Sequence, residues 1–434
     1  MIDIKLIRES PDVIKQRLRN KTADDLIPKE IDRIIELDHK RRTVISTCEA
    51  ERAEQNKVSK QIPEIKKSGG DTTEIISRMN ALKEKIHAAE AELHIIEKEL
   101  NDLMLRLPNP PDDDLAPGGK ENNEPLRYYG EPFVFDFEPK NHIDLCERLG
   151  LIDYHRGVKL SGSGFWVYKG AGARLEWALL NYFIDTHIAD GYELLLVPHM
   201  LEYNCGLTAG QFPKFYDEVF KIANPSDDRM HYMLPTAEAA LISMHRDEIL
   251  FESELPKKYI SYTPCFRREA GAYGAEERGM VRGHQFNKVE MVQFTTPEGS
   301  DAAFEELVSK AEALVAGLGF HFRTVKLAAG DCSAAMARTY DIEIQIPSMN
   351  GYKEVSSVSN ARCYQARRGA MRLRRGDTGH IEFMHTLNGS GLATSRILPA
   401  LVEQNQQKDG SVIVPDVLRK YLGGMELITP PERH

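Results

Sequence analysis

The sequence predicts an α+β protein made of a long helical hairpin followed by a larger domain built around an antiparallel sheet. Between residues 75 and 107, apolar residues recur at steps of three and four, which is the pattern of a coiled-coil helix. Strand-like segments come from distant parts of the remaining chain, with helices between them at irregular intervals, and this favours an antiparallel sheet. Neither a G-x-x-x-x-G-K-[ST] loop nor a strand-borne G-x-G-x-x-G occurs, so P-loop and dinucleotide-binding folds are disfavoured.

The composition is that of an ordinary soluble protein of two or three domains, with 434 residues, 41% of them hydrophobic and 28% charged. The net charge of -10 does not decide for or against nucleic acid, because phosphate binding depends on local basic patches. Six scattered cysteines without a C-x-x-C pair predict reduced thiols and a cytoplasmic location. We expect neither a signal peptide nor a transit peptide, and no membrane span.

The first 107 residues predict an N-terminal domain with a hairpin arm. A short helix is expected over Pro11–Lys21, and a long charged helix from about Lys29, which Pro63 should end or kink. Asp71 with Glu74 resembles a capping box for the returning helix. Both long helices, at about 1.5 Å per residue, should be on the order of 50 Å in length.

Near the tip of this arm, at residues 29–107, basic residues outnumber acidic ones. A local cationic excess suits a phosphate backbone. By charge alone, a plainly solvated face, a nucleic acid and a protein partner all remain open. The candidate contacts are Lys57, Lys60, Lys66, Lys67, Arg78, Lys83 and Lys85.

Residues 108–127 predict a linker, since they combine prolines, glycines and acids with nothing to bury. Residues 128–434 then form the larger domain. Within it we expect helices at 142–149, 172–190, 302–318 and 393–407, a buried strand at 193–197, and paired strands at 340–347 and 351–357.

The stretch from Tyr259 to Thr295 predicts two strands joined by a charged, glycine-containing loop. Because alternate strand residues share a face, one face of the second strand carries Phe286, Lys288, Glu290, Val292 and Phe294. Charges on such a surface are costly to desolvate without a partner. A polar ligand and an internal salt bridge are both compatible with the pattern.

Polar residues that suit nucleotide chemistry lie in four segments, and each segment by itself is only weak evidence for a nucleotide site. Thr236 in T-A-E could simply cap a helix, and Arg396 could form a salt bridge on a helix face. Together, however, Arg267 and Arg396 can fork onto phosphate oxygens, while Glu354 on a strand can hold the Mg²⁺ that bridges phosphates.

The same residues carry a dense resemblance to the bacterial-type seryl-tRNA synthetases, a family of class II aminoacyl-tRNA synthetases. The resemblance spans nearly the whole chain. FRREAG…RGMVRGHQFNKVE resembles the class II motif 2, GSGLATSR resembles motif 3, and residues 172–198 resemble motif 1, which builds the dimer interface in this family. PTAEAAL, TYDIEIQIP, EVSSVSN and HTLNGS resemble family-specific segments. Val358 and Ala361 depart from the common pattern, where cysteine and phenylalanine are usual.

The resemblance implies an ATP-dependent ligase that converts L-serine to seryl-adenylate and transfers the seryl group to the 3′ end of tRNA(Ser), with tRNA(Sec) a second candidate acceptor. It implies a homodimer and three catalytic residues, Arg267, Glu354 and Arg396. The implied ATP contacts are Arg267, Arg268, Glu269, Arg282, Phe286, Glu354, Val355, Ser356, Ser357 and Arg396. The implied serine contacts are Thr236, Ala237, Glu238, Arg267, Glu290, Asn388 and Ser390. Glu354 and Ser357 are the implied Mg²⁺ ligands.

Two rival functions remain open at this point. One is a relative that loads small amino acids onto a carrier protein, although such relatives lack the arm. The other is a catalytically silent paralogue that binds RNA or serves as a structural partner, although such a protein has no physical need for Arg267, Glu354 and Arg396 together.

Overall fold

The computed structural model describes residues 1–223, 229–269, 279–349 and 351–431. The chain divides into two compact units, one of residues 2–19 and 23–108 and the other of residues 1, 20–22 and 109–434. Among the described residues, none of the helices combines the length and the apolar character needed to cross a membrane.

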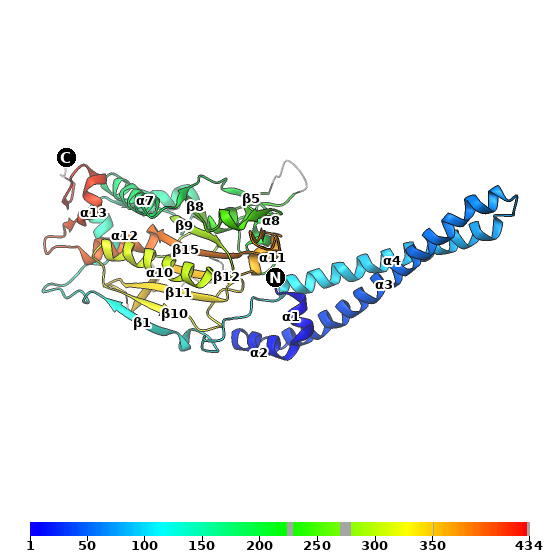
Figure 1. The fold of residues 1–434 in the computed structure, drawn as a ribbon. Coiled ribbons are helices and arrows are strands. Elements are labelled where there is room, and N and C mark those ends of the chain that lie inside the picture. Colours follow the sequence, from blue (N-terminus) through cyan, green and yellow to red (C-terminus); the bar gives the residue numbers. More distant parts are fainter. Residues whose placement is uncertain (224–228, 270–278, 350, 432–434) are drawn as a thin grey trace. The chain divides into compact units, whose positions relative to one another are not determined.

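The smaller unit contains the predicted hairpin. Helices α1 (Ile4–Glu9) and α2 (Pro11–Lys21) come first, and the last two residues of α2 are assigned to the larger unit. The long helices α3 (Leu26–Lys67) and α4 (Thr73–Arg106) follow and run side by side (Figure 1). The predicted seam is the buried one, since Ile86, Ile96 and Leu100 are all less than a tenth exposed. The 42 residues of α3 correspond to about 63 Å.

Two local features of the arm differ from the prediction. Helix α3 continues past Pro63 to Lys67, so Pro63 does not end it, although the proline removes one helical hydrogen bond. The returning helix has no capping box at Asp71 and Glu74. Instead, the Asp71 carboxylate accepts hydrogen bonds from the backbone N and the Oγ1 of Thr73, at 2.9 and 2.6 Å.

The larger unit is built on an eight-stranded sheet, whose mainly antiparallel pairing confirms the predicted kind of sheet. All neighbouring strands pair antiparallel except β4 and β8, which are parallel. Figure 1 shows strands from distant parts of the chain lying together in this sheet. In spatial order they are β1 (Glu124–Tyr129), β10 (Phe322–Lys326), β11 (Arg338–Gln345), β12 (Tyr352–Arg362), β15 (His385–Ala393), β9 (Gln285–Thr295), β8 (Lys257–Phe266) and β4 (Glu193–Leu194).

Helices α7 (Ala171–Ala189), α10 (Ser300–Gly317) and α12 (Thr394–Gln404) pack on the sheet and bury the main apolar core against it. They confirm three of the predicted helices, and α5 (His142–Arg148) confirms the fourth. The shorter elements are β2 (Ile152–Asp153), α6 (Tyr154–Ser161), β3 (Val167–Tyr168), β5 (Met200–Glu202), α8 (Tyr203–Thr208), β6 (His231–Met233), α9 (Glu238–Ser243), β7 (Ile249–Phe251), α11 (Tyr364–Arg368), β13 (Arg372–Arg374), β14 (Ile381–Phe383), β16 (Val412–Ile413), α13 (Asp416–Arg419) and β17 (Leu427–Ile428).

The structure differs from the prediction over two stretches of this unit. The segment expected to be a linker contributes part of β1 to the sheet and buries Asn109 and Leu115. Asn109 Nδ2 donates to the carbonyl oxygens of Ala335 and Ala361, each at 2.9 Å, so this polar segment is fixed by hydrogen bonds that composition does not reveal. The strand expected to be buried at 193–197 is only Glu193–Leu194, and Leu196 is 81% exposed.

Candidate active site

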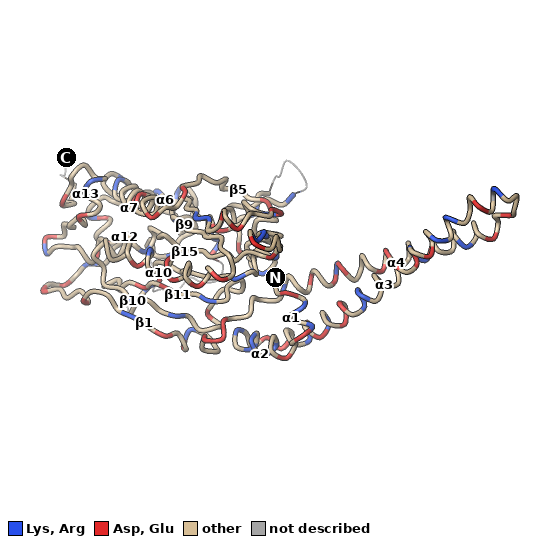
Figure 2. The backbone as a smooth tube through the Cα atoms, in the orientation of Figure 1, with Lys and Arg blue, Asp and Glu red and all other residues tan. Residues whose placement is uncertain are grey.

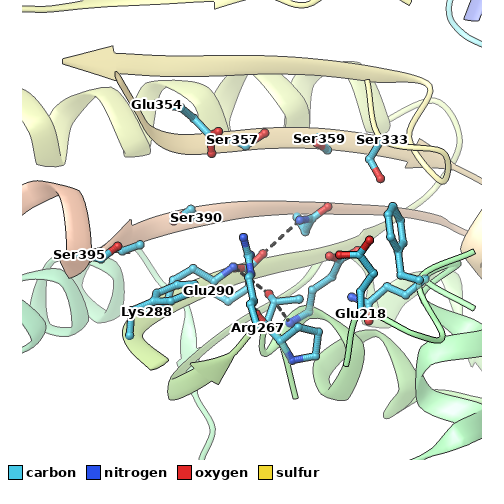
Figure 3. Close-up of a pocket in the computed structure, with 18 of the residues that line it drawn as sticks. Glu218, Arg267, Lys288, Glu290, Ser333, Glu354, Ser357, Ser359, Ser390 and Ser395 are labelled. Carbon is cyan, nitrogen blue, oxygen red and sulfur yellow. Dashed lines mark hydrogen bonds and ion pairs between the residues drawn. The ribbon is translucent and has the colours of Figure 1, made fainter. Parts of the chain in front are cut away.

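One face of β12, β15 and β9, together with Arg267 just after β8, lines a cavity of about 500 Å³. Figure 3 shows Glu354, Ser357 and Ser359 along one strand, Ser390 on the next, and Glu290 and Arg267 beyond it. The cavity gathers most of the predicted site residues from segments far apart in sequence. Those that line it are Thr236, Glu238, Arg267, Glu269, Arg282, Phe286, Glu290, Glu354, Val355, Ser357, Asn388, Ser390 and Arg396.

A β-bulge in β12 places two of these residues on the same side. In β12, Ser356 pairs with Ile342 and Glu354 pairs with Glu343, so Val355 is the extra residue. In a regular strand, residues three apart point to opposite faces, but a bulge between them restores a common face. Glu354 and Ser357 therefore both line the cavity.

A second irregularity, in β15, has the same effect at the next pair of strands. Ser390 pairs with Glu290, whereas Ala393 pairs with Lys288, so three steps along β15 match two steps along β9. Both members of each pair line the cavity. The backbone then leads directly into α12, which carries Arg396.

The floor of the cavity is a buried charged network around Glu290, which is 1% exposed. Lys288 forms an ion pair with Glu290, and its Nζ donates to Thr236 Oγ1 at 2.8 Å. Asn388 Nδ2 donates to Glu290 Oε1 at 3.1 Å. The sequence pattern was compatible with either an internal salt bridge or a polar ligand. The salt bridge between Lys288 and Glu290 is present, and both residues also line the cavity.

Two polar atoms in this part of the cavity are buried without a hydrogen-bond partner among the described residues. They are Asn388 Oδ1 and Ser390 Oγ, in side chains that are 9% and 8% exposed. Buried polar groups are rarely left unpaired in native proteins, because desolvation without a partner costs about 1–3 kcal/mol. Their position on the cavity face indicates a hydrogen-bonding ligand of small size.

Glu238 adds a second acid to the same region. Burial, followed by the nearby Glu290 carboxylate, raises the pKa of Glu238 to about 7. Gln365 Nε2 donates a hydrogen bond to Glu238 Oε1 at 2.8 Å, and this bond opposes the rise in the pKa. Glu238 and Glu290 are thus two buried acids close together, and the ammonium group of a small ligand placed between them would reduce their repulsion.

The other end of the cavity combines an aromatic ring with arginines. The Arg267 guanidinium carbon lies 5.1 Å from the centre of the Phe286 ring, and Arg267 Nε donates to the Pro235 carbonyl oxygen at 3.3 Å. Arg282 Nε donates to Glu269 Oε2 at 2.6 Å. The charged loop that the sequence predicts after Glu269 falls on residues 270–278, outside the described residues.

Glu354 and Arg396 meet at the exposed edge of the cavity. Arg396 Nη1 donates to the backbone oxygen of Glu354 at 2.6 Å and lies 3.6 Å from its carboxylate. Asp341 on β11 lies opposite Ser357. Burial, with the Glu354 carboxylate as the next cause, holds the pKa of Asp341 well above its usual range.

Three of the predicted residues do not line the cavity. Ala237 is buried in a hydrophobic cluster, and Ser356 points away so that its Oγ donates to the Ser390 carbonyl oxygen at 2.6 Å. Arg268 Nη1 instead donates to the Asp217 carbonyl oxygen at 2.6 Å. Strand alternation accounts for Ser356, because its neighbour Ser357 occupies the cavity face.

The cavity also has lining residues to which the sequence assigned no role. Lys288 was placed on the correct strand face by alternation, but its link to Thr236 depends on tertiary structure. Gln211, Ser333, Ser359 and Ser395 also line the cavity. Alternation with Ser357 is the signal that could have found Ser359, whereas Gln211 and Ser333 belong to loops whose position no local pattern gives.

The predicted cations of the arm are exposed where their side chains are described, which excludes that of Lys66. Arg78 is exposed but already forms an ion pair with Glu54 on the facing helix. Similar pairs between the two helices join Arg33 to Glu99 and Arg41 to Glu97, at 2.7 and 3.0 Å. Figure 2 shows acidic and basic residues interspersed along both helices.

An antiparallel sheet of this order, with a cavity on one face that Arg267 and Arg396 line, is the architecture of class II aminoacyl-tRNA synthetases. The family model "tRNA synthetase class II core domain (G, H, P, S and T)" matches residues 220–405. The model "Seryl-tRNA synthetase N-terminal domain" matches residues 1–111.

Known proteins that resemble the chain narrow this class to one family. A serine--tRNA ligase 2 of Clostridium acetobutylicum is 57% identical over 98% of this chain and 99% of its own length. A serine--tRNA ligase of Thermotoga petrophila is 46% identical over 98% and 99%. The crystal structure of seryl-tRNA synthetase from Pyrococcus horikoshii complexed with ATP has a TM-score of 0.92 at 33% identity, covering 100% of both chains. The chain belongs to the seryl-tRNA synthetase family, as the resemblance predicts.

Proposed function

We propose that the cavity binds ATP and serine side by side and forms seryl-adenylate, the first step of the serine--tRNA ligase reaction for which this family is named. The single observation that carries the proposal is the cavity itself. It joins Arg267, Glu354 and Arg396 to the buried polar pocket around Glu290. The ATP complex of the Pyrococcus relative supports ATP as a substrate.

At the nucleotide end, we assign Phe286 to stacking on the adenine and Glu269 to accepting a hydrogen bond from the adenine amino group, since both line the cavity. Arg267, above the Phe286 ring, is assigned to the α-phosphate, and Arg396 to the γ-phosphate. Forked guanidinium groups suit phosphate oxygens, because they donate two parallel hydrogen bonds. Arg282, fixed by Glu269, supplies a further phosphate contact.

At the serine end, the Glu238 and Glu290 carboxylates are assigned to the serine ammonium group. The unpaired Ser390 Oγ and Asn388 Oδ1 are assigned to hydrogen bonds with the substrate. A pocket built to bind a hydroxyl group rejects alanine and glycine, because its polar groups then stay unpaired. Threonine is excluded by the extra methyl group, which is worth about 1–3 kcal/mol.

The donor set of Glu354 and Ser357 fits a magnesium ion. Both residues supply the hard oxygen ligands that Mg²⁺ prefers, and the bulge at Val355 turns them to the same side. A magnesium ion held by Glu354 and Ser357 would supply positive charge to offset the negative charge that develops during displacement.

The reaction needs no nucleophile from the protein. The serine carboxylate attacks the α-phosphorus of ATP, the bond to the bridging oxygen breaks, and pyrophosphate leaves. Arg267 and Arg396 hold the phosphates in line and stabilise their charge, so positioning and electrostatics supply the acceleration. The terminal ribose hydroxyl of tRNA then takes the seryl group from the adenylate and releases AMP.

We assign tRNA binding to residues 1–107 and catalysis to residues 128–434. The match of the N-terminal family model to residues 1–111 supports the first assignment. The exposed tip cations Lys57, Lys60 and Lys83 support backbone contacts with an RNA helix, whose deep major groove hides the base edges. tRNA(Ser) is the proposed acceptor, and charging of tRNA(Sec) stays a prediction.

We further propose a homodimer formed along α7 and β4. Large apolar side chains are exposed there in the single chain, with Trp177 at 54%, Leu194 at 38% and Leu196 at 81%. Apolar surface of this kind marks an interface. Replacing Leu196 by glutamate should shift the mass measured by sedimentation equilibrium toward the monomer, and an unchanged mass would count against this surface. We also propose a cytoplasmic location, which the free state of all six cysteines supports.

The proposed function is tested by serine-dependent exchange of labelled pyrophosphate into ATP, followed by charging of tRNA(Ser) and tRNA(Sec) transcripts. We expect exchange and charging of tRNA(Ser). Exchange without any tRNA charging would favour a carrier-protein loader, and the absence of exchange would favour a catalytically silent paralogue.

A further inference from the structure

Gln365 lies directly behind the part of the cavity wall that Glu238 forms. Its side chain is fully buried, and it does not line the cavity. Gln365 Nε2 donates to Glu238 Oε1 at 2.8 Å and to the Ala209 carbonyl oxygen at 3.0 Å. Both amide hydrogens are therefore used, and one of them holds a carboxylate of the serine pocket from outside.

The orientation of this amide is fixed from its other side. Thr386 on β15, which is fully buried, donates from Oγ1 to Gln365 Oε1 at 2.6 Å. A flipped amide would turn its oxygen toward the Glu238 carboxylate and toward the Ala209 carbonyl, and both contacts would become repulsive. The donor side of Gln365, which lies on α11, is thus kept toward Glu238 by Thr386 on β15 and by Ala209 at the end of α8.

We propose that Gln365 is a positioning residue for the amino-acid substrate, which orients the Glu238 carboxylate and so sets the affinity for the serine ammonium group. This proposal rests on the proposed function, in which Glu238 binds serine.

The choice of a neutral donor has a physical reason. The charged groups that face Glu238 are Glu290 and Lys288 from β9 and Arg267 beyond the end of β8. Lys288 is already paired with Glu290. An uncharged amide behind Glu238 favours its ionised form without supplying a cation that would compete with the substrate for the carboxylate.

The test is steady-state pyrophosphate exchange by the full-length chain carrying Gln365→Met, which keeps the volume but removes all three hydrogen bonds. We expect the KM for serine to rise about tenfold or more, because a hydrogen bond to a charged group is lost. The KM for ATP should stay within about twofold. The matched control is Gln293→Met, since Gln293 is equally buried but donates to Tyr192 Oη at 2.6 Å on the opposite face of β9. This control should leave both KM values unchanged.

A second variant keeps the proposal testable if Gln365→Met folds poorly. Thr386→Val retains Gln365 but releases its orientation, so it should raise the KM for serine in the same direction by a smaller factor. Equal changes in both KM values, or an unchanged KM for serine in a folded variant, would overturn the positioning role. Failure of the wild-type chain to exchange pyrophosphate with serine would instead overturn the proposed function itself.

Discussion

Glu354→Gln separates the chemistry of the site from its folding more clearly than other substitutions in the cavity. The Glu354 side chain is 47% exposed, and its carboxylate lies 3.6 Å from Arg396. Exposed ion pairs contribute at most about 1 kcal/mol, so the loss of stability should stay below that value. Arg396 remains in place, because its short hydrogen bond goes to the backbone oxygen of Glu354 and not to the side chain.

The expected loss of activity is much larger. Removing one group that stabilises charge in a transition state lowers kcat by about 10²–10³-fold, or roughly 3–4 kcal/mol. We therefore expect serine-dependent pyrophosphate exchange to fall at least a hundredfold, while the thermal unfolding midpoint changes by no more than about 2 °C.

Lys353→Gln is the matched control for this substitution. Lys353 precedes Glu354 on β12 and does not line the cavity, so its replacement should leave exchange intact. Exchange above a tenth of the wild-type rate in Glu354→Gln would refute the metal-binding role. A large drop in the thermal unfolding midpoint together with the loss of exchange would refute the claim that Glu354 acts in the chemistry and not in folding.

Three further outcomes are expected. Phe286→Leu should raise the KM for ATP about tenfold and leave the KM for serine unchanged, since stacking on a base contributes about 1–3 kcal/mol; equal effects on both substrates would contradict adenine stacking. Burial raises the pKa of Glu176 to about 7 from 4.5, so the stability it contributes is complete below pH 4.5 and is lost as the pH rises through 7. Denaturant unfolding of Glu176→Gln should lack this loss, which amounts to about 2–3 kcal/mol between pH 5 and pH 8 in the wild type. An identical pH dependence of the unfolding free energy in both proteins would be inconsistent with the raised pKa. Replacing residues 29–107 by a short flexible linker should spare pyrophosphate exchange and abolish tRNA charging, and normal charging by this variant would remove the arm from RNA recognition.

The parts of the fold that were predictable from sequence are those that follow from local periodicity. The seam at Ile86, Ile96 and Leu100 repeats at helical spacing, and the face of Phe286, Lys288 and Glu290 repeats at strand spacing. Both patterns depend only on neighbouring residues, so the structure retains them. The prediction of an antiparallel α+β sheet is likewise confirmed.

The parts that were missed depend on contacts between distant segments. Val355 carries no local sign of a bulge, yet the bulge decides that Glu354 and Ser357 share a face. Asn109 looks like a linker residue because its partners, Ala335 and Ala361, lie more than 200 residues away. Leu196 reads as a core residue, but it is exposed in the single chain because apolar character alone does not say which surface will cover it.

The most direct test of the account is a crystal structure of the protein with Mn²⁺, in place of Mg²⁺, and a non-hydrolysable ATP analogue. The account predicts an anomalous peak within bonding distance of the Glu354 carboxylate and Ser357 Oγ, with Arg267 on the α-phosphate and Arg396 on the γ-phosphate. A metal ion bound elsewhere, or a triphosphate that touches neither arginine, would contradict it.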